Sequence, residues 1–392
     1  MGQREGADSN YKEGGGQLAP IHRFQFLVIG GSGRTRDHWS RLRWLAAGLF
    51  NCYCILGFVL ATVFMLSRAA SRCLMPGVLL LLSASAIAQT ASPAIWLGGL
   101  DPISRHAKYP DMSSDYMDMF QPNAPWNHAA ASVKVFELGP KFVMEASDEM
   151  LSQIFSNLKQ RNISVAIGAS WLPGSDACGK GVEGFTHSGT AVSVANRIHR
   201  LGGDVKYVVM DEPLYFGHKY NKQNACQWPI PEVASKVAVE IAAFQQVFPS
   251  AQICDAEPVA TPDVGWVSEI MQWTHAYQSA THLSLACFQA DVQWTGPWQQ
   301  QLAELKNRLH AAGIQLGIIY NGDGNAQTGL QWTQQSEQRI RMVEANPALM
   351  PDQALIQSWT REPDRMLPEN QTGTMTSLVL QYVQQHKAND GR

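Results

Sequence analysis

Short apolar runs alternate with amphipathic stretches along most of this 392-residue chain. The runs are rich in β-branched residues, as is typical of strands buried on both faces. They predict eight strands, at residues 94–97, 133–138, 164–171, 205–210, 252–255, 283–288, 315–320 and 354–359. Between them, apolar residues recur at helical spacing. This spacing predicts helices at residues 148–160, 191–200, 231–248, 266–278, 298–312, 334–344 and 377–386.

Regular alternation of strands and helices favours parallel strands joined by right-handed crossovers. Eight such repeats within residues 89–392 favour a closed barrel over an open sheet. Gly202 and Gly313 follow predicted helices, as expected of residues that end a helix with positive φ. The predicted fold class is therefore α/β, as a single (β/α)8 TIM barrel spanning residues 89–392.

The first 88 residues have a different pattern. Residues 44–66 are almost continuously apolar and long enough to cross a bilayer. Residues 74–82 are apolar but too short to span, and small residues follow them up to Ala88. Such a short apolar region followed by small residues is typical of a secretory signal peptide cleaved after Ala88. Residues 1–88 are therefore predicted to be an N-terminal extension outside the barrel.

Two interpretations of this extension are open. In the first, translation truly starts at Met65, and residues 65–88 are the signal peptide. In the second, residues 44–66 anchor the protein in a membrane, with Arg41 and Arg43 on the cytoplasmic side. Both predict a secreted or periplasmic barrel, and in the second the protein is membrane-anchored. The N-terminal segment, if uncleaved, is the only predicted membrane contact.

The charge balance weakens one class of function. The chain has 30 Lys and Arg against 33 Asp and Glu, a formal charge of −3, so there is no electrostatic reason to expect nucleic acid as a partner. The 12 tryptophans serve mostly for packing, although aromatic rings also stack on sugars. We expect a monomer without metal or cofactor.

Four cysteines lie within residues 89–392. Their spacing matches no metal site. Cys178 and Cys226 fall in loops after successive strands, so export to an oxidising compartment would allow one disulfide between them. Cys254 and Cys287 fall near or within predicted strands and are predicted to be buried thiols.

Active sites of (β/α)8 barrels lie at the carboxyl ends of the strands. The fourth predicted strand ends in Asp211-Glu212-Pro213, which places two acids at this position. Acids and aromatic residues also occur at or after the ends of other predicted strands. The candidate site residues are Glu212 and Glu257 as catalytic acids, with Asp211, Tyr215, His218, Trp171, Asp291, Tyr320 and Trp359 as substrate contacts.

Carboxylates and aromatic rings around one cavity suit glycoside hydrolysis, in which one acid protonates the leaving oxygen and a second carboxylate attacks the sugar or activates water. Asp211-Glu212-Pro213 resembles the Asn-Glu-Pro signature of the clan A (β/α)8 glycoside hydrolases, with Asp211 in place of asparagine. The resemblance implies that Glu212 is the general acid/base. It also implies that Trp359, at the end of strand eight, forms the floor of the sugar site.

The chain departs from that clan at strand seven, where residues 319–323 contain no glutamate to serve as nucleophile. Glu257 is the first choice for the second carboxylate, because Glu257-Pro258 repeats the arrangement of Glu212-Pro213. Asp255, Asp291 and Asp323 are alternatives. Neither the retaining nor the inverting route is favoured by the sequence.

The sequence thus predicts an exported glycoside hydrolase that acts on a poly- or oligosaccharide. The missing strand-seven glutamate supports an alternative, a non-catalytic carbohydrate-binding barrel involved in assembly of a surface polysaccharide, because a fold does not dictate function.

Overall fold

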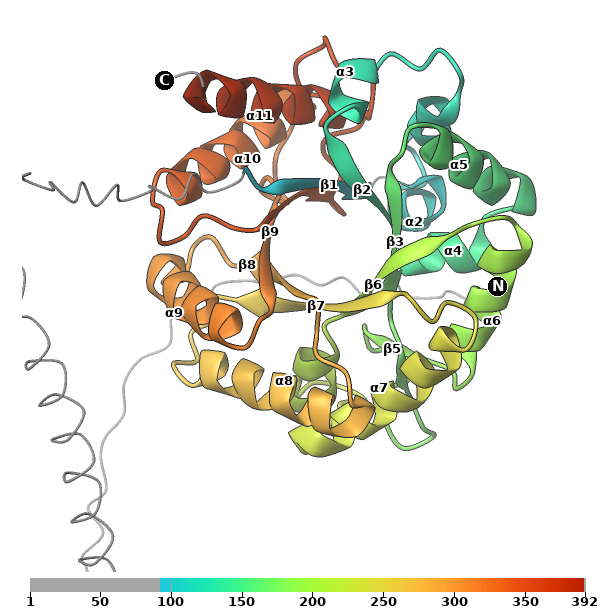
Figure 1. Cartoon of the computed structure of the whole chain (residues 1–392), viewed down its shortest axis with the longest axis vertical. Helices are drawn as coiled ribbons and strands as arrows, with labels where there is room; N and C mark the ends of the chain where they lie inside the picture. Colours follow the sequence, from blue (N-terminus) through green and yellow to red (C-terminus); the bar gives the residue numbers. More distant parts are fainter. Residues whose placement is uncertain (1–91, 100, 391–392) are drawn as a thin grey trace, which may run out of the picture. The chain divides into compact units, whose positions relative to one another are not determined.

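The computed structural model describes residues 92–99 and 101–390. Within them, eight parallel strands close into a barrel surrounded by helices (Figure 1). This confirms the predicted α/β class and the (β/α)8 architecture. In barrel order the strands are β1 (Ala94–Gly99), β2 (Val133–Leu138), β3 (Ser164–Ala169), β6 (Val205–Asp211), β7 (Gln252–Val259), β8 (Cys287–Val292), β9 (Gln315–Tyr320) and β10 (Gln353–Ser358), which pairs with β1.

Each predicted helix has a counterpart in the outer ring (Figure 1). The long helices are α5 (Asp148–Gln160), α6 (Thr190–Arg200), α7 (Ile230–Gln245), α8 (Trp266–Thr281), α9 (Trp298–Ala311), α10 (Gly329–Glu344) and α11 (Met375–Asp390). Shorter elements are α2 (Pro102–Lys108), η1 (Tyr116–Phe120), α3 (Asn127–Ala130), α4 (Pro140–Glu145), η2 (Tyr215–Lys219) and the small sheet of β4 (Leu172–Pro173) and β5 (Phe185–Thr186). Helix α10 starts earlier than predicted because the Thr328 side chain accepts a hydrogen bond from the Gln331 N–H.

Alternation along each strand divides the core into two layers. One layer fills the barrel interior and consists of Trp96, Val135, Ala166, Val209, Cys254, Cys287, Ile319 and Leu355. The other, larger layer lies mostly between the strands and the surrounding helices. A strand residue therefore faces the barrel axis only if it is an even number of positions from one of these interior residues.

Two strands differ from the prediction in ways that affect the site. Strand β8 begins at Cys287 instead of residue 283, because His282 ends α8 with a left-handed φ of 60° and the following residues form the connection. Strand β7 continues to Val259 instead of ending at Asp255, pairing with β8 up to Val292. Glu257 consequently lies within a strand and not after it.

The structure contains two disulfides in its described part. Cys178 and Cys226, which the sequence left as a possible pair, are bonded, with a Cα–Cα distance of 5.1 Å. The prediction that Cys254 and Cys287 are free thiols was wrong, because these cysteines are also bonded. They are direct register partners on β7 and β8, with a Cα–Cα distance of 4.6 Å, and both face the barrel interior.

None of the helices within residues 92–99 and 101–390 is both long and apolar enough to span a bilayer. The predicted apolar span at residues 44–66 and the predicted signal peptide at residues 65–88 lie outside the described residues.

Candidate active site

A cavity of about 470 Å³ lies at the carboxyl ends of the barrel strands. Its wall is acidic, because six carboxylic acids line it against two cations, Arg105 and Lys108. The six acids are Asp101, Glu137, Glu183, Asp211, Glu212 and Asp291. This is the end of a (β/α)8 barrel at which catalysis takes place.

Strand alternation explains why three of these acids reach the cavity. Asp211 is two residues beyond the interior Val209, and Glu137 is two residues beyond the interior Val135. Asp291 is four residues beyond the interior Cys287 and therefore lies on the same face of β8. Each of these side chains therefore points towards the barrel axis above the apolar interior.

Glu212 reaches the cavity for a different reason. Alternation after Asp211 would direct it outward, but its backbone is left-handed, with a φ of 51°. The Glu212 N–H donates to the Ala256 carbonyl oxygen at 3.0 Å, and its own carbonyl oxygen accepts from the Phe216 N–H at 3.0 Å. A non-glycine residue in this region costs on the order of 1 kcal/mol, which the two hydrogen bonds help to offset.

The surroundings of Glu212 and Asp291 raise the pKa values of these two acids by different amounts. Burial in the cavity wall raises the pKa of Glu212 well above its ordinary range, and the charge of Asp291 is the next largest cause. Burial and the charge of Asp211 raise the pKa of Asp291 only to about 6, because the Arg339 charge and a hydrogen bond from Asn321 oppose the rise. The surroundings therefore favour the protonated form of Glu212, whereas Asp291, with a pKa of about 6, is mostly ionised at neutral pH.

Two further acids were missed by the sequence analysis. Burial and the charge of Asp211 raise the pKa of Glu137 to about 8. Glu183 lies on an exposed loop before β5, where its pKa is raised to about 7, an effect that solvent moderates. Glu137 could have been found from the sequence, because it lies two residues after Val135 on the same strand and therefore on the same face. The sequence carries no comparable signal for Glu183. Its loop can approach β6 closely because Gly184 has no side chain; a Cβ there would lie 2.9 Å from the Asp211 carbonyl oxygen.

Two aromatic residues, Tyr109 and Trp359, line the cavity. Trp359 lines it and is 44% exposed, which is high for so large an apolar side chain. The structure thus places Asp211, Glu212, Asp291 and Trp359, four of the predicted site residues, on one cavity.

Glu257 lies outside this cavity, contrary to its predicted role. It is fully buried on the outer face of β7, one residue from the inward-facing Ala256. Its Oε1 accepts from the Leu214 N–H at 2.6 Å, and its Oε2 accepts from the Tyr215 N–H at 3.0 Å. Glu257 is therefore a structural carboxylate that holds the segment following Glu212.

Two of the alternatives to Glu257 are also engaged elsewhere. Asp255 is fully buried on the outer face of β7, and its Oδ2 accepts from the Trp273 indole N–H at 2.7 Å. Asp323 forms an ion pair with Arg339. Of the three alternatives, only Asp291 lines the cavity.

Four predicted substrate contacts belong to the packing outside the cavity. The Tyr320 hydroxyl donates to Glu344 at 3.0 Å, since Tyr320 faces outward, next to the interior Ile319. Trp171 is buried with its ring 5.0 Å from that of Phe244. His218 Nδ1 lies 2.7 Å from the Trp228 carbonyl oxygen, and the Tyr215 ring lies edge-on to Trp266 at 6.2 Å.

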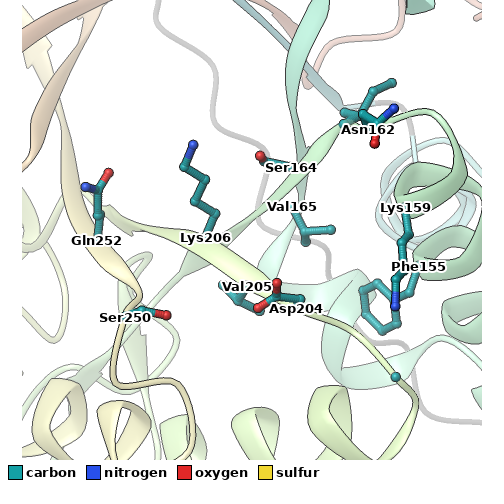
Figure 2. Close-up of a pocket in the computed structure, with 12 residues that line it drawn as sticks. Phe155, Lys159, Asn162, Ser164, Val165, Asp204, Val205, Lys206, Ser250 and Gln252 are labelled. Carbon is teal, nitrogen blue, oxygen red and sulfur yellow. The ribbon is translucent and has the colours of Figure 1, made fainter.

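A second cavity lies at the opposite end of the barrel. It measures about 540 Å³ and is formed at the amino ends of β3, β6 and β7. Figure 2 shows Lys159, Lys206 and Asp204 among its lining side chains. It is larger than the acidic cavity, but it contains one carboxylate without an acidic partner and lies at the end of the barrel associated with stability. We therefore assign the candidate active site to the acidic cavity.

No group of three or more His, Cys, Asp or Glu side chains in the described part of the chain is arranged to hold a metal ion.

Fold and site together define a (β/α)8 barrel protein with a carboxylate-lined cavity at its carboxyl face. No protein-family model and no curated protein matches the chain. Solved structures to which it is similar include a GH10 protein from Paenibacillus barcinonensis, with 10% identity, coverage of 73% of this chain and 94% of that chain, and a TM-score of 0.45. A GH10 endoxylanase from a sugarcane soil metagenome has 8% identity, 75% and 97% coverage and a TM-score of 0.47. A fungal β-1,4-galactanase has 10% identity, 74% and 99% coverage and a TM-score of 0.47. At such values these likenesses carry no argument about function.

Proposed function

We propose that this protein is a glycoside hydrolase in which Glu212 donates the proton to the leaving oxygen and Asp291 is the second catalytic carboxylate. The observation that carries the proposal is the pair itself: two acids line one cavity, and their surroundings raise the pKa of Glu212 well above its ordinary range but that of Asp291 only to about 6. Glycoside hydrolysis needs one neutral and one ionised carboxyl group at the same time.

Asp291 replaces Glu257 as second carboxylate for two reasons. It lines the same cavity as Glu212, whereas Glu257 does not. Among the charges of the neighbouring acids, the charge of Asp291 raises the pKa of Glu212 most. Asp211 lines the same cavity and accepts a hydrogen bond from the Ser170 hydroxyl at 3.0 Å.

We also propose that the barrel is exported. Both pairs of cysteines in the described part are disulfide-bonded, and disulfides persist in oxidising compartments. The predicted signal peptide at residues 65–88 or the predicted anchor at residues 44–66 would direct the chain there.

The direct test is release of reducing ends from a panel of bacterial and plant polysaccharides. We expect the full-length protein to release them from at least one polymer. Binding of a polysaccharide without any release would support the alternative, a carbohydrate-binding barrel, which the absence of a glutamate at the end of β9 favours.

The pH dependence of kcat/KM follows from the two acids. Asp291 must be ionised, so the rate should rise as the pH increases through about 6. Glu212 must be protonated, so the rate should fall again only above its raised pKa. Initial rates from about pH 4 to pH 10 measure both limbs. A maximum near pH 4, with loss of activity by pH 6, would contradict this assignment.

Trp359 is proposed to stack on a sugar at the cavity edge. Trp359→Ala should raise KM about tenfold and change kcat little, because a stacking contact contributes about 0.5–1.5 kcal/mol. Its 44% exposure predicts little change in the melting temperature. Leu330→Ala, at a residue 46% exposed on α10 and outside the cavity, is the matched control. An unchanged KM for Trp359→Ala would remove this residue from the sugar site.

A further inference from the structure

Glu137, Glu183 and Asp211 line the cavity together, and the charge of Asp211 raises the pKa of the other two. Within the described part of the chain, none of these three carboxylates forms an ion pair. Of the two lining cations, Arg105 donates to the Pro363 carbonyl oxygen at 2.9 Å, and Lys108, whose charge acts on Glu183, donates to the Trp359 carbonyl oxygen at 3.4 Å.

Glu137 adds a second, independent observation. Its side chain lines the cavity and is only 7% exposed, and its Oε2 has no hydrogen-bond partner. The Gln357 side chain supplies one hydrogen bond to the carboxyl group. A buried carboxyl oxygen without a partner is costly, so an ordered water, an ion or a ligand is expected to satisfy it.

The missing partner must donate hydrogen bonds and carry positive charge. A neutral sugar hydroxyl donates one hydrogen bond but leaves the charge of Asp211 uncompensated. An anionic sugar would be repelled by the acids. A primary ammonium group has three donors and a full positive charge, so it satisfies both requirements.

We propose that the cavity binds a sugar with a free ammonium group, and that the substrate is a polymer containing de-N-acetylated amino sugars. This inference rests on the proposed hydrolase function and names its substrate class. Glu137 and Asp211 hold the ammonium group at the floor of the cavity, and Glu183 adds negative charge at its mouth.

Binding of an ammonium group should also release protons from the acids of the cavity. A positive charge beside Glu137 and Glu183 favours their ionised forms, so both groups lose protons when the ligand binds near neutral pH. The attraction should weaken as salt concentration rises.

The test compares matched oligosaccharides. Oligomers of glucosamine and galactosamine are prepared in the linkages known for natural polymers, and part of each is re-N-acetylated chemically. Binding is measured by calorimetry with the full-length Glu212→Gln protein, whose cavity keeps its charge but not its acid. We expect at least tenfold tighter binding of one ammonium oligomer than of its acetylated counterpart, with a binding enthalpy that changes with the ionisation enthalpy of the buffer, as proton release requires. Equal or tighter binding of the acetylated member in every pair would overturn the inference.

A variant locates the ammonium site. Glu137→Gln should weaken binding of the ammonium oligomer about tenfold and leave binding of the acetylated oligomer unchanged. Glu304→Gln, on the outer helix α9, is the control, because Glu304 pairs with Arg308 at 2.8 Å and does not line the cavity. Equal loss for both oligomers would assign Glu137 a merely structural role and overturn its place in the site. If Glu137→Gln does not fold, the comparison of oligomers decides alone.

Failure of this inference is distinguishable from failure of the hydrolase proposal. Cleavage of a neutral polysaccharide, with no preference for ammonium oligomers, would keep the hydrolase and overturn the amino-sugar substrate. If the protein binds an ammonium oligomer tightly but never cleaves it, the amino-sugar ligand is supported and the proposed hydrolase function is overturned.

Discussion

Glu212→Gln is expected to lower kcat about 10²–10⁴-fold on the polysaccharide that the protein cleaves, because positioned general acids contribute rate factors of this size. Glutamine has nearly the shape of the protonated glutamic acid but no proton to transfer. Since burial favours the neutral form of Glu212, the substitution should leave KM and stability nearly unchanged. Initial rates on the polysaccharide measure the effect.

A change of leaving group separates a lost proton donor from general damage. Aryl glycosides with acidic phenols need little protonation, so Glu212→Gln should keep much more of its rate on them than on the natural glycosidic bond. Glu232→Gln, at an exposed residue of α7 paired with Lys236, should behave like the unaltered protein on both. An equal loss on both kinds of substrate would argue against Glu212 as the acid.

Glu257→Ala should lower the free energy of unfolding by about 3 kcal/mol, because it leaves the Leu214 and Tyr215 N–H groups without acceptors in a buried site. The loss of packing around a fully buried side chain adds to this cost. Chemical denaturation, followed by far-UV circular dichroism, measures the change. Activity should fall as well, since the segment after Glu212 loses its support.

Glu257→Gln distinguishes structural support from catalysis. Its remaining oxygen can accept only part of what the carboxylate accepted, so we expect a smaller loss of stability than for alanine. The pH profile of the folded Glu257→Gln protein should match that of the unaltered protein. Full stability of Glu257→Ala, combined with complete loss of turnover, would instead restore Glu257 as the second catalytic carboxylate.

The barrel was predictable because burial on both faces leaves a local signal. Apolar runs such as Val133–Leu138 and Gln315–Tyr320 were located to the residue, and Asp148–Gln160 showed the helical period of one buried side. The position of Glu212 was also readable, since Pro213 marks the end of a strand and barrel sites lie at strand ends.

The choice of the second carboxylate required the structure. Glu257-Pro258 looks like Glu212-Pro213 in sequence, yet β7 continues through it and directs Glu257 outward, whereas a left-handed backbone turns Glu212 into the cavity. The two motifs differ in strand length and in one φ angle. Neither quantity is set by the residues of the motif alone, because pairing with the neighbouring strand decides where a strand ends.

By itself, then, the sequence determined the class of fold, the order of its elements and three of the acids that line the cavity, Asp211, Glu212 and Asp291, because each depends on hydrophobic period or on where a strand ends. Only the tertiary structure decided which acids share a cavity. Asp291, Glu137 and Glu183 meet there through strand register and loop packing, and Cys254 is bonded to Cys287 for the same reason. Register is a relation between distant segments, and no single segment carries it.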